Sequence, residues 1–113
     1  MTATMMKLLK ILIIEDDHVE RRQLCERIKA AFGAVELIEF ETESAFYTKI
    51  DGVLADGLDL AIVDALLPWQ FPSPESSPAP VDVTEGGFWN AGARCVQRLR
   101  ASPRGDVIPV IVH

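Results

Sequence analysis

The sequence LLKILIIEDD at residues 8–17 decides the fold, because a short apolar run rich in β-branched residues ends abruptly in three acids. A second run, DLAIVD at residues 59–64, has the same form and ends at Asp64. Such runs are typical of strands buried on both faces of a parallel sheet, whose ligands bind beyond the carboxyl ends of the strands. If the two strands are neighbours, Glu15, Asp16 and Asp64 meet at that edge. We then expect a divalent cation of the magnesium type to offset their mutual repulsion.

Strands and helices alternate along the chain, which predicts parallel βαβ crossovers and a three-layer α/β/α domain. Asp17 is expected to begin the first helix, with Glu20 completing a capping-box pattern, and Gly33 is expected to end it. The other predicted elements are an edge strand at 35–40, a helix opened by Thr42 or Ser44, a helix at 92–101 and a strand at 108–112.

Residues 69–91 differ from the rest of the chain, because they are rich in proline and serine. This composition predicts an inserted loop without a helix or strand of its own. The aromatic residues of the loop suit either a partner-binding surface or contacts that fold the loop back onto the domain. They are Trp69, Phe71, Phe88 and Trp89. The arginines of the helix that follows are expected to form a solvated face.

The composition predicts one domain over residues 1–113, since 49% of the residues are hydrophobic and 25% are charged. The net charge of -6 argues against binding to nucleic acids or anionic membranes, which attract basic patches. Cys25 and Cys95 form no CxxC motif and are predicted to be buried, reduced thiols of a cytoplasmic protein. No stretch has the length of a membrane span, and the first apolar run is unlike a signal peptide because Lys10 interrupts it.

Taken in order, these segments resemble the receiver domain of two-component response regulators, whose fold is flavodoxin-like. The resemblance is carried by residues 11–17, the acceptor strand at 59–64, Leu67-Pro68 just past it, the helix at 92–101 and the strand at 108–112. These segments stand in the family's order, at nearly its spacing, and cover almost the whole chain outside the loop.

The resemblance implies that Asp64 accepts a phosphoryl group from a phosphohistidine on a sensor histidine kinase or a phosphotransfer protein. It further implies a Mg²⁺ ion held by Asp16, Asp64 and the backbone carbonyl of Leu66, with Glu15 acting through water. Such a domain is a signalling switch rather than a turnover enzyme, and phosphorylation changes its contacts with an output protein. Asp17 is expected to cap the first helix instead.

The chain departs from the family's pattern in two places. Residues 69–91 contain an insertion of about 20 residues, well beyond ordinary loop lengths. The family's hydroxyl residue and lysine would follow His113, so we expect a fragment of a longer protein without its C-terminal elements. The open sheet edge of such a fragment favours a homodimer.

Two other functions are weighed against the phosphoacceptor. One is a pseudo-receiver that is never phosphorylated and acts as a docking or dimerisation module through the aromatic insertion. The other is an aspartate-nucleophile phosphohydrolase, which is disfavoured because it needs a second aspartate at the position of Leu66.

Overall fold

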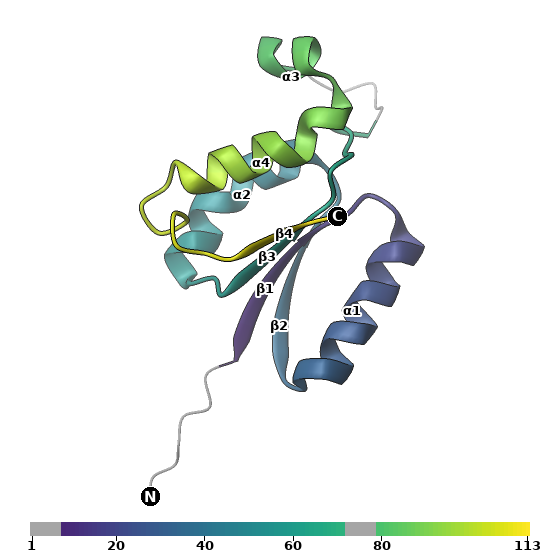
Figure 1. Cartoon of the computed structure of the whole chain (residues 1–113), viewed down its shortest axis with the longest axis vertical. Helices are drawn as coiled ribbons and strands as arrows, with labels where there is room; N and C mark the ends of the chain where they lie inside the picture. Colours follow the sequence, from purple (N-terminus) through teal and green to yellow (C-terminus); the bar gives the residue numbers. More distant parts are fainter. Residues whose placement is uncertain (1–7, 72–78) are drawn as a thin grey trace, which may run out of the picture.

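The computed structural model describes residues 8–71 and 79–113, which build a parallel sheet packed between helices (Figure 1). The strands are β1 (Leu9–Ile14), β2 (Val35–Phe40), β3 (Leu60–Val63) and β4 (Val110–Val112). Their order, β2-β1-β3-β4, and their parallel pairing give a flavodoxin-like topology. The predicted α/β fold is therefore confirmed. Ile14 of β1 pairs with Val63 of β3, so the two strands end side by side.

The helices form a layer on each face of the sheet, as predicted (Figure 1). One face is covered by α1 (His18–Phe32), and the other is covered by α2 (Glu43–Asp56) and α4 (Ala91–Arg100). The short helix α3 (Val81–Gly86) and the 3-10 helix η1 (Phe88–Asn90) precede α4, and α3 stands away from the sheet (Figure 1). Leu12 and Ile14 of β1 pack with residues of α2 and α4, whereas Ile11 and Ile13 pack with residues of α1. The first apolar run lacks alternation because both of its faces are covered.

The starts of α1 and α2 are fixed by side-chain caps. Asp17 caps α1, where its carboxylate accepts hydrogen bonds from the amides of Val19 and Glu20 at 2.9 and 3.0 Å. The capping-box prediction is wrong in its second half, because the Asp17 amide donates to Glu15 Oε2 at 3.3 Å. The side chain of Thr42 caps α2 and settles the choice between Thr42 and Ser44. The hydrogen bond from the Asp17 amide thus connects the Glu15 carboxylate to the start of α1.

The prediction of a loop without regular structure at 69–91 is wrong for its second half, where α3 and η1 lie. Residues 72–78 of that prediction lie outside the described residues. α3 begins directly after Pro80, and its residue Val83 is buried. A six-residue helix that buries one apolar side chain has no helical period to detect, which explains why the composition was misleading.

The two cysteines are buried and form no disulfide, which confirms their predicted burial. Burial is the main cause that raises the pKa of Cys95 to about 12, so its thiol stays protonated and unreactive. Among the helices of the described ranges, none combines the length and the apolar character needed to cross a membrane.

Candidate functional site

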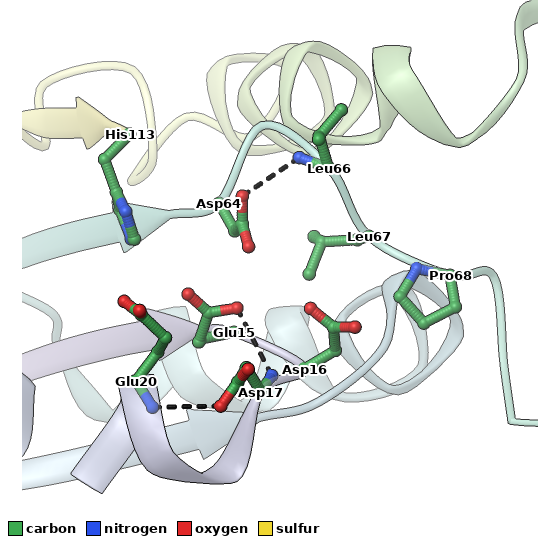
Figure 2. Close-up of a pocket in the computed structure, with 9 residues that line it drawn as sticks. All are labelled: Glu15, Asp16, Asp17, Glu20, Asp64, Leu66, Leu67, Pro68 and His113. Carbon is green, nitrogen blue, oxygen red and sulfur yellow. Dashed lines mark hydrogen bonds between the residues drawn. The ribbon is translucent and has the colours of Figure 1, made fainter. Parts of the chain in front are cut away.

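An open pocket of about 710 Å³ lies at the carboxyl ends of β1 and β3 (Figure 2). We call it the acidic pocket. It is lined by Glu15, Asp16, Asp17, Glu20, Asp64, Leu66, Leu67, Pro68 and His113. Its position at the carboxyl edge of a parallel sheet is the position where ligands bind in this class of fold.

Three carboxylates converge in this pocket. Glu15, Asp16 and Asp64 each offer one oxygen atom, and these oxygens all lie within 4.8 Å of one another. Glu15 is buried, whereas Asp16 and Asp64 are half-buried, and the three carboxylates lie around the same space (Figure 2). The structure therefore brings together the three side chains that the sequence analysis selected. Oxygen donors at this spacing match the ligand preference of a hard divalent cation.

The sheet itself positions the acids, because its hydrogen bonds continue one residue past each strand. The amide of Glu15 donates to the carbonyl of Phe40 at 3.0 Å, and the amide of Asp64 donates to the carbonyl of Ile14 at 3.0 Å. The Asp64 side chain then accepts a hydrogen bond from the amide of Leu66 at 3.0 Å. The carboxylates are thus carried on rigid backbone rather than on a free loop.

Burial is the main cause that raises the pKa of Glu15 to about 8, and hydrogen bonding with Asp64 and its charge add to this effect. The hydrogen bond from the Asp17 amide opposes the shift. In the absence of a cation, Glu15 therefore holds a proton at neutral pH. A cation entering the pocket would displace this proton, so its affinity should rise with pH.

The raised pKa of Glu15 predicts an unusual pH dependence of stability without metal. The folded state binds the proton more tightly than the unfolded state, so the free energy of unfolding falls as the pH rises from about 4.5 to about 8. We expect the Glu15→Gln variant to lack this decline, so that its stability exceeds that of the unsubstituted protein by a margin that widens as the pH approaches 8. Urea unfolding with EDTA across this range measures both curves, and parallel curves would contradict the prediction.

The segment that follows Asp64, residues 65–69, is held by the amino-terminal ends of two helices. We call it the acceptor loop. From α2, the amide of Glu43 donates to the carbonyl of Pro68 at 3.0 Å, and the amide of Ser44 donates to that of Trp69 at 2.8 Å. From α4, the amide of Gly92 donates to the carbonyl of Ala65 at 3.1 Å. Within the loop, Leu67 is fully buried and Leu66 is exposed at the pocket, where its carbonyl stays a predicted ligand.

Gly92 allows α4 to approach the backbone of Asp64 and Ala65. A Cβ atom at this position would lie 2.7 Å from the carbonyl oxygen of Asp64 and 2.7 Å from the Cα atom of Ala65. Both neighbours are backbone atoms, so neither can rotate away. The absence of a side chain at Gly92 is therefore a condition for the geometry of Asp64.

We expect Gly92→Ala to displace the acceptor loop and to destabilise the fold by about 2 kcal/mol, as overpacking does in a close contact. Gly52 is the matched control, because it lies within α2 with no heavy atom near its added Cβ. Urea unfolding of the two alanine variants measures the difference, and equal stability would show that the Gly92 contact relaxes freely.

Sequence reasoning missed Arg21, whose guanidinium contacts the backbone of Glu15 in the acidic pocket. It donates to the carbonyl of Glu15 at 2.8 Å and to the carboxylates of Glu39 and Glu41 at 3.1 and 2.8 Å. Its side chain is only 12% exposed. These partners lie on β2 and just beyond it, so local spacing along α1 carried no signal of them.

The prediction of a solvated arginine face on α4 is wrong. Arg94 is buried and pairs with Glu43, while Arg98 pairs with Asp51 at 2.7 Å. Arg100 donates to three backbone carbonyls of the following turn. α4 thus uses its arginines to bind α2 and its own C-terminal turn.

The aromatic residues of the insertion divide between the two roles considered for them. The ring of Trp69 packs against Tyr47 of α2 with centroids 5.6 Å apart, so Trp69 folds back onto the domain. Phe71 and Trp89 are 44% and 62% exposed, which suits a surface role. The side chain of Phe88 is outside the described part of the chain.

Comparison with known protein families finds no match to this chain, and comparison with curated proteins finds no similar sequence. The function must therefore be inferred from the acidic pocket itself.

Proposed function

We propose that this chain is a phosphoacceptor domain of the receiver type, in which Asp64 takes a phosphoryl group in the presence of Mg²⁺. The observation that carries the proposal is the convergence of Glu15, Asp16 and Asp64 within 4.8 Å at the ends of two neighbouring parallel strands. A flavodoxin-like sheet supports the same function. The donor is a phosphohistidine on a sensor histidine kinase or phosphotransfer protein, and the output is a changed contact with another protein.

The chemistry of the residues fits a hard cation. Three of the carboxylates that line the acidic pocket lie within 4.8 Å of one another, and carboxylate oxygens are the donors that magnesium prefers. Asp16, Asp64 and the carbonyl of Leu66 would hold the ion, with Glu15 acting through water. When bound, Mg²⁺ would neutralise charge on the phosphoryl oxygens.

The transfer step requires one nucleophilic oxygen and little other covalent machinery. A carboxylate oxygen of Asp64 attacks phosphorus, and a new P–O bond forms as the P–N bond of the donor phosphohistidine breaks. The imidazole nitrogen keeps the electron pair of that bond and takes up a proton. Asp64 is suited to this role because it is half-buried in an open pocket, so a donor can reach it.

The test is to incubate the chain with acetyl phosphate and Mg²⁺ and to measure the intact mass. Transfer from this donor releases acetate and leaves one phosphoryl group on the protein. We expect a gain of one phosphoryl group with Mg²⁺ and none with EDTA. The absence of any gain under both conditions would contradict the proposed function.

We expect Asp16→Ala to weaken Mg²⁺ binding by about tenfold or more, because it removes a direct ligand. Calorimetric titration with Mg²⁺ measures the affinity. Asp17→Asn is the control, because Asp17 lines the same pocket but its carboxylate caps α1, a role that asparagine retains. An unchanged affinity of Asp16→Ala would place the cation elsewhere.

The second candidate, a docking or dimerisation module without phosphorylation, is favoured by the exposure of Val81 and Trp89 at 70% and 62%. Large exposed apolar side chains on the inserted segment suit an interface. The phosphorylation assay separates the two candidates, since the docking module takes up no phosphoryl group. Sedimentation of a Val81→Ser/Trp89→Ser variant would then test whether this segment forms a homodimer.

A further inference from the structure

We infer that the buried ion pair between Glu43 and Arg94 positions the acceptor loop and, through it, the oxygens that hold the cation. The inference rests on the proposed function and deepens it, because it assigns positioning residues to that site. Neither residue lines the acidic pocket.

The pair is a forked contact that is almost completely removed from solvent. Arg94 Nε and Nη2 donate to the two carboxylate oxygens of Glu43 at 2.7 and 2.8 Å. The Glu43 side chain is 0% exposed and that of Arg94 is 10% exposed. Two parallel hydrogen bonds fix the relative orientation of the partners as well as their distance, which a single point contact does not.

Both partners stand beside the atoms that hold the acceptor loop. Glu43 is the first residue of α2, and its own amide donates to the carbonyl of Pro68. Arg94 follows two residues after Gly92, whose amide donates to the carbonyl of Ala65. The pair therefore joins the two helix ends whose amides hold the acceptor loop.

Further contacts connect the pair to its surroundings. Tyr47 follows Glu43 by one turn of α2, and its ring packs against Trp69 at the end of the acceptor loop. Arg94 Nη2 also donates to the carbonyl of Gly87 at 2.9 Å, in the turn between α3 and η1. The Glu43–Arg94 pair thus contacts the inserted segment through Gly87 and lies next to the residues that hold the acceptor loop.

The test compares two double variants that each remove one ion pair between α2 and α4. Glu43→Met/Arg94→Met removes the buried pair without leaving a lone buried charge. Asp51→Met/Arg98→Met is the matched control, because it removes a pair on the same helices, about 12 Å further along α2. Calorimetric titration with Mg²⁺ and hydrogen exchange of the Ser44 and Gly92 amides are measured for both.

We expect the Glu43→Met/Arg94→Met variant to bind Mg²⁺ about tenfold more weakly, as is usual when support behind metal ligands is lost. Its Ser44 and Gly92 amides should exchange faster at unchanged secondary structure. The control variant should stay within about twofold of the unsubstituted protein in both measurements. Equal Mg²⁺ affinity in the two double variants would overturn the inference.

A measurement on the unsubstituted protein covers the outcome in which the first double variant does not fold. Because coupling is reciprocal, Mg²⁺ should slow the solvent exchange of the Arg94 Nε proton, observed by NMR, and leave that of Arg98 unchanged. Equal behaviour of the two arginines would overturn the inference. Failure of the proposed function is distinct, since the unsubstituted protein would then take up no phosphoryl group from acetyl phosphate, whatever the exchange of the two arginines shows.

Discussion

Replacing Asp64 with asparagine is expected to abolish phosphoryl uptake and to leave the fold intact. The amide lacks the carboxylate oxygen that attacks phosphorus, so no acyl phosphate can form. Its side-chain oxygen still accepts the hydrogen bond that the amide of Leu66 donates to Asp64, at 3.0 Å in this structure. The acceptor loop should therefore keep its conformation. Intact mass after incubation with acetyl phosphate and Mg²⁺ measures uptake, and urea unfolding measures the fold.

The matched control for this variant is Asp17→Asn. Asp17 lines the same pocket and loses the same charge, but asparagine is an equally good helix cap. We expect this control to take up one phosphoryl group. If the Asp64→Asn variant still took up a phosphoryl group, another residue would be the phosphorylation site. Glu15 and Asp16 would then be replaced next.

The largest effect on stability is expected for Arg94→Met. This variant leaves the carboxylate of Glu43, which is completely buried, without its partner. Removing one member of a buried pair destabilises a protein by about 3–5 kcal/mol, a large share of the stability of a domain of this size. Urea unfolding at pH 7 measures the loss.

Arg98→Met is the control for this prediction. Its partner Asp51 has a side chain that is 75% exposed, so water can solvate the carboxylate that remains. We expect a change of at most about 1 kcal/mol in this control. If the two methionine variants were equally stable, the burial of the Glu43–Arg94 pair would have no energetic significance.

The sequence was sufficient for the sheet and for the convergence of the acids. β1 and β3 are apolar on both faces, which only a covered parallel sheet explains, and each ends at an acid. Neighbouring parallel strands end at the same edge of the sheet. The acids that follow the two strands in the sequence were therefore predicted to lie close together in space. Asp17 was correctly assigned as a cap for a similarly local reason, since its partners are two and three residues away.

The features that were missed depend on contacts between distant residues. Arg94 was assigned to a solvated face because α4 alternates arginines with apolar residues. Its burial depends on Glu43, which is 51 residues away and belongs to another helix. Arg21 was missed for the same reason, as its carboxylate partners are 18 and 20 residues away. Hydrophobic periodicity shows which face of a helix is apolar. It does not show which charged side chain on that helix forms a buried ion pair with a distant residue.

The placement of the two tryptophans gives the protein its own optical reporters. Trp69 ends the acceptor loop and packs on Tyr47, whereas Trp89 is 62% exposed. Fluorescence emission of indole moves to longer wavelengths with hydration, so the two side chains should emit in distinguishable bands. The fluorescence of Trp69 would then report changes at Asp64, five residues earlier in the chain. The fluorescence of Trp89 would report changes in the inserted segment.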